Sequence, residues 1–239
     1  MLGDIGLQSR IQYTYVPLAN RVLANNGHGL QVDGDFGILR LPSGSYEVNQ
    51  FHVHFPSEHS IDGAIYAGEL HIVHQKTSSN STNDLAFVSI MLNTTDDFAS
   101  IPKGGVDFFQ NLGFEALDTP LPDRYDPKNT SKHVDLNVFQ QVLRGHYAHD
   151  FGSLTTPPCS ETVQWFVMLD PFIISRSVIQ EFTALHSDAP SPHNRRPLQP
   201  LNGRVVFYDD LIGPGDTDLD GFHDEDVQNI TLAIKEEEA

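Results

Sequence analysis

Alternating and continuous apolar positions predict that strands dominate this chain. Apolar and polar side chains alternate over residues 11–17 and 30–40, which is the pattern of a strand with one buried face. Residues 46–55 and 67–75 are two further β-like runs. Leu85–Leu92 is a nearly unbroken apolar run, which favours a central strand buried on both faces.

Two shorter stretches have helical spacing. Residues 134–144 place apolar side chains at helical intervals and predict a short helix or turn. Ser177 followed by Gln180 has the form of a capping box, which marks the start of a helix that we expect to run through His186. The apolar side of this helix would contain Val178, Ile179, Phe182 and Leu185.

Three histidines stand on two of the predicted strands. Alternate side chains of a strand point to the same face, so His52 and His54 share a face. The run that carries His71 follows a gap long enough for the chain to turn and return antiparallel. A single histidine in a strand is most often a half-buried polar residue. Three imidazoles converging from paired strands, however, leave one position of a tetrahedron open, as in a catalytic zinc site.

The same histidines also fit a different metal site. His52 and His54, with Glu58 four residues on and a distant histidine, form the ligand pattern of cupins, which hold iron or manganese. Spacing alone does not separate these two kinds of site. The motifs elsewhere in the chain do.

Several separated motifs occur in one order along the chain. They are Asn25-Asn26-Gly27-His28, the histidine cluster with Ser57-Glu58-His59, the run Gly152-Ser153-Leu154-Thr155-Thr156-Pro157-Pro158-Cys159-Ser160-Glu161, Trp165, and Asn194-Arg195-Arg196-Pro197 leading to Asn202-Gly203-Arg204. Over roughly residues 10 to 208, this order resembles the α-class carbonic anhydrases, and the combination is highly specific. The resemblance implies a mainly β (α+β) fold. It would be a single domain around a large twisted, mostly antiparallel sheet with short peripheral helices.

The resemblance also assigns roles around the histidines. It implies that zinc is bound by His52, His54 and His71, and that these rings donate hydrogen bonds to Gln50, to the backbone carbonyl of Asn194 and to Glu69, respectively. Glu69 and His71 lie two residues apart and so share a strand face, which is consistent with this pairing. We expect His59 and His74 to be structural residues rather than ligands.

Three further residues are catalytic by resemblance. The hydroxyl of Thr155 would accept a hydrogen bond from zinc-bound hydroxide and donate one to an ionised, buried Glu58. The backbone N–H of Thr155, with Thr156 beside it, would face the substrate or an anionic inhibitor. His28 matches the proton-shuttle position, and an imidazole titrates near neutral pH. The alternative for His28 is a surface histidine without a role.

An apolar wall for the substrate is implied as well. Val73, Leu154, Val163 and Trp165 match the residues against which the family holds carbon dioxide. Phe87 is a departure, because aligned on Ala86 it falls where the family has a smaller aliphatic residue. Its ring would crowd the pocket. A shift of one residue in the alignment would put Val88 there instead.

The implied function is the zinc-dependent, reversible hydration of carbon dioxide to bicarbonate and a proton, with sulfonamides and anions as inhibitors. Two alternatives stay open. One is a catalytically weak, carbonic-anhydrase-like binding or matrix protein, associated with calcium through its acidic tail. The other is a different metallohydrolase on the same site. The intact set of metal and catalytic residues favours the carbonic anhydrase.

Charge and hydropathy restrict the partners. The 239 residues include 32 acids and 14 lysines and arginines, and the formal net charge of −18 argues against binding nucleic acid. No apolar run approaches the roughly 20 residues of a membrane span. We expect residues 1–208 to form the catalytic domain, without the family's N-terminal segment.

The cysteine count and the glycosylation motifs bear on the compartment. Cys159 is the only cysteine, so no disulfide can form within this chain. In secreted members of the resembled family, a cysteine in this motif is commonly bonded to one near the N-terminus. We expect no signal peptide here, because Met1-Leu2-Gly3-Asp4 lacks both a basic region and an apolar stretch. Four sequons, at Asn80, Asn93, Asn129 and Asn229, fit a secreted origin, whereas a cytosolic chain with a free thiol stays open.

The composition changes after residue 208. Residues 209–239 are strongly acidic, and we expect a flexible extension there. Asp216, Asp218, Asp220 and Asp224 have the spacing of a short calcium loop, but its twelfth position is Val227 rather than a bidentate glutamate. The sequence therefore predicts at most weak calcium binding at these residues.

Overall fold

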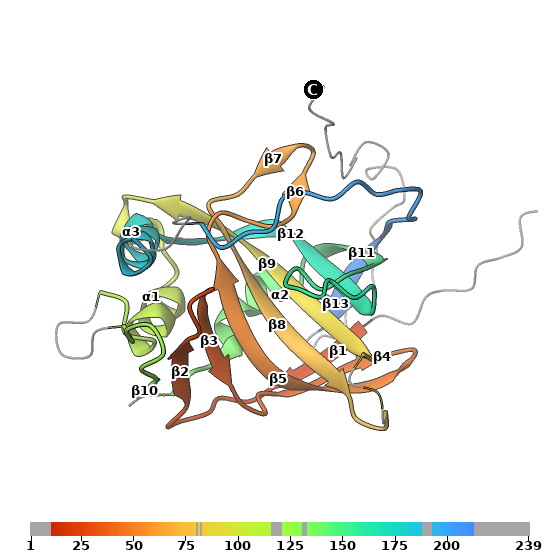
Figure 1. Cartoon of the computed structure of the whole chain (residues 1–239), viewed down its shortest axis with the longest axis horizontal. Coiled ribbons are helices and arrows are strands. Elements are labelled where there is room, and N and C mark those ends of the chain that lie inside the picture. The colour runs from red at the N-terminus through yellow and green to blue at the C-terminus, as the bar shows by residue number, and fades with distance from the viewer. Residues whose placement is uncertain are drawn as a thin grey trace, which may run out of the picture.

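Strands form most of the described chain. The computed structural model describes residues 11–79, 81, 83–115, 121–130, 133–187 and 193–212. Figure 1 shows long, twisted strands side by side, with α1 and α3 at one end of the sheet. Among the described residues, no helix is long and apolar enough to cross a membrane.

One large sheet contains most of the strands. Its members are β1 Ile11–Tyr15, β2 Val22–Asn25, β3 Leu30–Asp33, β4 Gly37–Leu41, β5 Gly44–His54, β8 Gly68–Lys76, β9 Leu85–Thr95, β10 Lys128–Asn129, β11 His146–Gly152, β12 Val163–Ser175 and β13 Phe207–Ile212. Their order is β10-β2-β3-β5-β4-β1-β13-β11-β12-β9-β8. β6 Ser60–Ile61 and β7 Ala64–Ile65 pair in a separate hairpin.

The pairings in this sheet are mostly antiparallel. Only β1 with β13 and β9 with β12 are parallel among the strands described. β5 pairs with β4 and β3 along one edge and with β8 along the other. β8, the last strand in this order, therefore also pairs with β5. As a result, β5 has more pairing partners than any other described strand. The predicted large twisted, mostly antiparallel sheet is confirmed.

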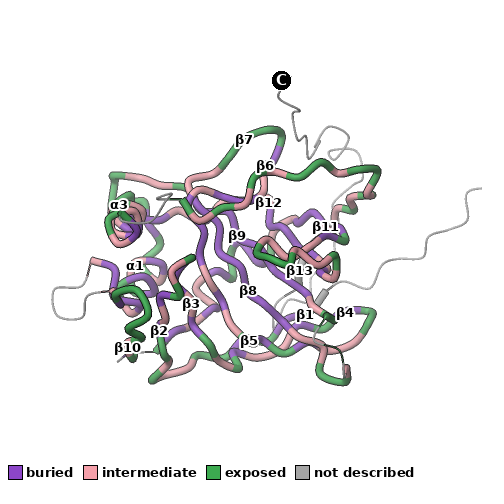
Figure 2. Tube along the Cα trace, viewed as in Figure 1, coloured by how far each residue is buried: buried purple, intermediate pink, exposed green. Residues whose placement is uncertain are grey.

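The two faces of the sheet bury two different apolar clusters. β9 is buried from Ala86 to Leu92, as its unbroken apolar run predicts. Alternate residues of this strand belong to different clusters: Val88 packs in the larger core, while Phe87 and Met91 pack in the smaller one. Figure 2 shows β8 and β9 as the continuously buried centre of the molecule. Side chains on the smaller-cluster face are those that can line a site beside the histidines.

Short helices lie around the sheet, as predicted. They are α1 Lys103–Asn111, α2 Gln140–Leu143 and α3 Arg176–Leu185, with 3₁₀ turns at Phe98–Ser100 and Leu136–Phe139. Residues 136–143 thus confirm the short helix or turn expected at 134–144. The sequence patterns did not single out α1.

The predicted start of α3 was wrong. Ser175, not Ser177, is the N-cap, and its hydroxyl oxygen accepts a hydrogen bond from the backbone N–H of Ser177. Ser177 instead donates its hydroxyl hydrogen to Glu115. The helix begins earlier because β12 runs directly into it, and the first residue able to cap it is the last residue of the strand.

The sheet extends beyond the expected domain boundary. β13 continues to Ile212, so residues 209–212 belong to the sheet rather than to an extension. The candidate calcium residues Asp216, Asp218, Asp220 and Asp224 lie outside the described residues, and their role stays a prediction. The same holds for the sequons at Asn80 and Asn229.

Candidate metal centre

The three histidines meet where β5 and β8 pair. His52 lies directly opposite His71 in the antiparallel register, and His54 follows on the same face of β5. One nitrogen from each ring lies within 4.8 Å of the others. His54 and His71 are buried, whereas His52 is half-buried. Three ring nitrogens therefore lie close together at the buried end of two long strands.

The outward nitrogen of each ring is held by an oxygen acceptor. His52 Nδ1 donates to Gln50 Oε1 at 2.8 Å, His54 Nδ1 to the Asn194 backbone oxygen at 2.7 Å, and His71 Nε2 to Glu69 Oε1 at 2.6 Å. All three partners are those that the resemblance implied. Because the outward nitrogens carry the hydrogens, the lone pairs of His52 Nε2, His54 Nε2 and His71 Nδ1 point inward.

The inward nitrogens fit a tetrahedral zinc ion. His52 Nε2 lies 3.2 Å from His71 Nδ1. Zinc–nitrogen bonds of about 2.0–2.1 Å at tetrahedral angles would place two ligand nitrogens about 3.3 Å apart. Two lone pairs at such a separation repel each other unless a cation lies between them. The buried Nε2 of His54 has no hydrogen-bond partner, which is consistent with a metal ligand.

Burial also prepares these rings for a metal. Desolvation, with the neighbouring histidines, holds the pKa of His52 well below its ordinary value. Desolvation, followed by His71, likewise lowers the pKa of His54. Neutral imidazoles are the form that binds a metal, so neither ring has to lose a proton first at neutral pH.

Glu69 is a fully buried carboxylate with an unusually complete set of donors. Besides His71, it accepts from the backbone N–H groups of Glu58 and His59, from His59 Nδ1 at 2.7 Å, and from Ser89 Oγ at 2.5 Å. Burial would raise the pKa of Glu69, but His59 and His71 hold it well below the usual range. An ionised Glu69 fixes the orientation of His71 and makes that ring a better ligand.

Ser89 and the bond from His59 to Glu69 are parts of the site that the sequence reasoning did not single out. His59 was expected to be structural, and it packs against Glu69 rather than joining the inward nitrogens of the triad. Burial would lower the pKa of His59, but the Glu69 carboxylate, with smaller contributions from Asp150 and Glu58, raises it overall. Ser89 lies opposite His71 on β9, so only the strand register reveals its role.

Glu58 lies beside the inward nitrogens. Its Oε1 accepts from the backbone N–H of Arg196 at 2.7 Å, while its buried Oε2 has no hydrogen-bond partner and lies 3.3 Å from His54 Nε2. The hydrogen bond from Thr155 that the resemblance implied is therefore not formed here. Glu58 Oε2 is therefore a buried acceptor beside the inward nitrogens.

The loop between β11 and β12 carries Thr155 and Thr156. It is closed by a backbone hydrogen bond from Leu154 to Ser160 at 3.0 Å and fastened to the core by Trp165 Nε1, which donates to the Ser153 carbonyl at 3.1 Å. Thr155 is half-buried and Thr156 is exposed. The catalytic role of both residues stays a prediction.

The residues of the expected apolar wall lie together. Val73, Phe87, Val163 and Trp165 belong to one buried cluster, and Leu154 packs against it. Phe87 pairs with Val73 across β8 and β9, and its ring lies 4.8 Å from that of Trp165 and 6.1 Å from that of His71. Phe87, and not Val88, therefore faces the site.

His28 lies in an exposed turn between β2 and β3. Its backbone N–H and that of Gly29 both donate to Asn26 Oδ1. A side-chain carbon at Gly29 would meet Asn194 Nδ2 at 2.7 Å, so the turn packs closely on the residue that supports His54. This contact places the His28 turn beside the residue whose backbone carbonyl holds His54.

Comparison with known proteins agrees with this geometry. The model of the eukaryotic-type carbonic anhydrase family matches residues 7–210. A carbonic anhydrase from Nostoc sp. is 34% identical over 201 residues, which cover 84% of this chain and 68% of that protein. The α-carbonic anhydrase of Photobacterium profundum has a similar structure, with a TM-score of 0.68 and 28% identity over 84% of this chain and 82% of that one. That of Thermovibrio ammonificans, solved with the inhibitor sulfanilamide, has a TM-score of 0.67 and 26% identity over 84% and 80%. The chain therefore belongs to the eukaryotic-type carbonic anhydrases, a family of enzymes.

Proposed function

We propose that this chain catalyses the reversible hydration of carbon dioxide to bicarbonate and a proton, with zinc held by His52, His54 and His71. One observation carries the proposal. Each of these rings commits its outer nitrogen to an oxygen acceptor and turns its other nitrogen toward a common point. A zinc ion bound there lowers the pKa of a water ligand to about 7 and so supplies hydroxide at neutral pH.

The protein's own groups would orient and enclose the reactants. Glu58 Oε2 is a buried acceptor that can hold a hydrogen from Thr155 or from a bound water. Val73, Leu154, Val163 and Trp165 offer an apolar surface that suits carbon dioxide and excludes water. The backbone N–H of Thr155 would meet the oxygen on which negative charge develops.

His28 is proposed to return the proton to solvent. Its exposed imidazole lies in a turn that packs against Asn194, beside the metal centre. An exposed imidazole can take up a proton and pass it to buffer.

Stopped-flow measurement of carbon dioxide hydration tests the proposal. The zinc-loaded protein is compared with His54→Ala and with His133→Ala, an exposed histidine away from the triad. We expect hydration to vanish in His54→Ala and to persist in His133→Ala. A protein that holds one zinc ion without hydrating carbon dioxide would contradict the proposal and favour a binding protein.

Inhibitor binding and compartment belong to the same proposal. Sulfanilamide, the inhibitor in the Thermovibrio ammonificans structure, should bind the zinc-loaded protein and not the His54→Ala variant, as calorimetry would measure. A secreted origin is supported by the exposed side chains of the sequon residues Asn93 and Asn129. Glycosidase treatment of the protein from its native source should then lower its mass.

A further inference from the structure

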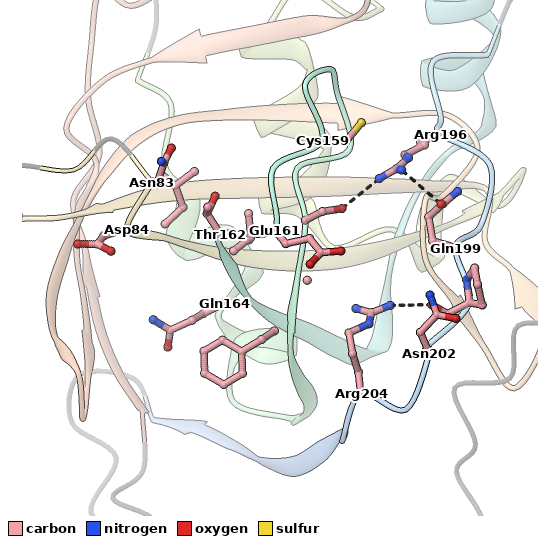
Figure 3. Close-up of a pocket in the computed structure, with 16 residues that line it drawn as sticks. Asn83, Asp84, Cys159, Glu161, Thr162, Gln164, Arg196, Gln199, Asn202 and Arg204 are labelled. Carbon is pink, nitrogen blue, oxygen red and sulfur yellow. Dashed lines mark hydrogen bonds between the residues drawn. The ribbon is translucent and has the colours of Figure 1, made fainter.

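The loop that carries Leu154 and Thr155 also borders an open groove. The groove has a volume of about 660 Å³, and its polar lining includes Cys159, Glu161, Thr162, Arg196, Gln199 and Arg204. Figure 3 shows Arg196 at one side of this groove, with its guanidinium directed toward the β11–β12 loop. None of the three histidines of the metal centre lines the groove.

Arg196 bonds to the β11–β12 loop and to Glu58 beside the metal centre at the same time. Its Nη1 donates to Ser153 Oγ at 3.0 Å and to the Leu154 carbonyl oxygen at 3.3 Å, and its Nη2 donates to Gln199 Oε1 at 3.3 Å. Its backbone N–H donates to Glu58 Oε1 at 2.7 Å. One residue therefore links the buried carboxylate beside His54 with the loop that precedes Thr155.

The bond to the Leu154 carbonyl has a geometric consequence for Thr155. The cis peptide bonds of the described chain precede Pro56 and Pro158, so the bond between Leu154 and Thr155 is trans. In a planar trans peptide, the C=O and the following N–H point in opposite directions. Because Arg196 holds the Leu154 carbonyl from the groove side, the Thr155 N–H must point away from the groove.

The charged guanidinium of Arg196 donates its hydrogen bonds to these neutral acceptors. Within the described part of the chain, no carboxylate forms an ion pair with Arg196, whereas Arg204 in the same groove pairs with Asp150. Hydrogen bonds from a charged donor are roughly twice as strong as neutral ones. The fork geometry of arginine also lets one nitrogen reach the loop while the other reaches Gln199.

We propose that Arg196 is a positioning residue for the reaction at the metal centre. Its side chain holds Ser153 and the Leu154 carbonyl from the groove and thereby aims the Thr155 N–H at the substrate. The inference rests on the proposed function for its effect on rate. The orientation of the Thr155 N–H does not depend on that function and can be measured separately.

The first experiment compares Arg196→Ala with Arg195→Ala in the zinc-loaded protein. Arg195 is the neighbouring, exposed arginine, so both changes remove one charge from the same segment. Arg196→Ala keeps the backbone N–H that binds Glu58, so zinc should still bind. We expect kcat for carbon dioxide hydration to fall roughly tenfold, the loss that accompanies one charge-assisted hydrogen bond, with KM little changed. Arg195→Ala should match the wild type.

The second experiment observes the Thr155 amide directly, by NMR of protein with ¹⁵N-labelled threonine. Arg196→Ala should shift the Thr155 resonance, and Arg195→Ala should not. Guanidinium ion, added below the concentration that unfolds the protein, should enter the groove and partly restore both the resonance and kcat of Arg196→Ala. If Arg196→Ala does not fold, Arg196→Lys takes its place and should show the same shift, since an ammonium group lacks the fork.

Two results would overturn the inference. One is an unchanged Thr155 resonance in a folded, zinc-loaded Arg196 variant. The other is a loss of kcat that appears only together with loss of zinc, which would mean a merely structural role. If the wild type hydrates no carbon dioxide, the proposed function fails, while the amide resonance still decides whether Arg196 orients Thr155.

Discussion

At the level of single residues, Phe87 is where this chain departs most from the pattern that it otherwise resembles. The ring lies on the same face as the metal centre and packs edge-on against Trp165. It takes up space that a smaller aliphatic side chain would leave open. The neighbouring Val88 points into the larger core and cannot replace it in the wall.

Phe87→Val should therefore raise the catalytic efficiency. Removing the ring opens space beside Trp165, and relieving a crowded pocket is worth about 1–3 kcal/mol, which corresponds to roughly 5- to 150-fold in kcat/KM for carbon dioxide. Stopped-flow hydration assays would measure it, with Met91→Leu in the same cluster as the control. An unchanged kcat/KM would mean that the ring lies outside the path of the substrate.

His74 makes a second residue-level prediction, which concerns acid stability. This ring is fully buried; its Nδ1 donates to the Ala86 carbonyl, so its Nε2 accepts from the Tyr15 hydroxyl. Burial lowers the pKa of His74 to about 4. In the unfolded chain an imidazole titrates near 6.5. The stabilisation from a neutral His74 is therefore complete above about pH 6.5 and is lost as the pH falls toward 4.

Urea unfolding at pH 7 and pH 5 would test this. The free energy of unfolding should fall by roughly 2 kcal/mol more in the wild type than in His74→Gln, which cannot take up a proton. His52 and His54 act in the same direction, but they are common to both proteins. An equal fall in the free energy of unfolding in the two proteins would contradict the assignment of this effect to His74.

At the level of elements, strand alternation predicted correctly that the three histidines converge. His52 and His54 are two residues apart, and the antiparallel return of β8 brought His71 opposite His52. Side chains alternate along a strand with a period of two, so spacing in the sequence strongly indicates which residues share a face. When two such strands pair, residues from both lie on a common face. Side chains reached through a third strand or a loop, such as Ser89 and Arg196, carry no comparable signal in the sequence.

Helix α3 shows where local sequence signals failed. Ser177 and Gln180 satisfy a capping-box pattern, yet the tertiary path of β12 placed the helix start at Ser175. Capping motifs describe which residues can cap, whereas the position of the cap depends on where the preceding strand stops. The boundary of β13 at Ile212 was missed for a similar reason, because pairing with β1 and β11 extends the strand into an acidic segment.

Ser175→Ala should destabilise the protein, whereas Gln180→Ala should not. The Ser175 hydroxyl caps a backbone N–H, and losing such a cap costs about 1 kcal/mol. Gln180 is exposed, so its truncation should change the free energy of unfolding by less than about 0.5 kcal/mol. Urea unfolding curves of the two variants would distinguish them. A larger loss of stability for Gln180→Ala than for Ser175→Ala would instead support the capping box predicted from Ser177 and Gln180.

At the level of the whole molecule, metal binding should couple to stability. The triad lies on the two long strands that close the sheet, so a ligand common to both strands stabilises the folded state. Zinc at a thousand times its dissociation constant should add about 4 kcal/mol to the free energy of unfolding. Thermal unfolding with and without a chelator would measure this. His54→Ala should lose the response, and an equal response in that variant would place the metal elsewhere.

The bonds from Asn194 to β5 have a consequence for how the protein folds. They join positions 140 residues apart in the chain, and β1 with β13 are separated still further. Contacts between such distant segments raise the contact order, and proteins of high contact order fold slowly. The hydrogen bond that orients His54 cannot form until Asn194 has left the ribosome. We therefore expect full metal affinity to appear late during folding, so that zinc uptake reports the completed fold rather than its first strands.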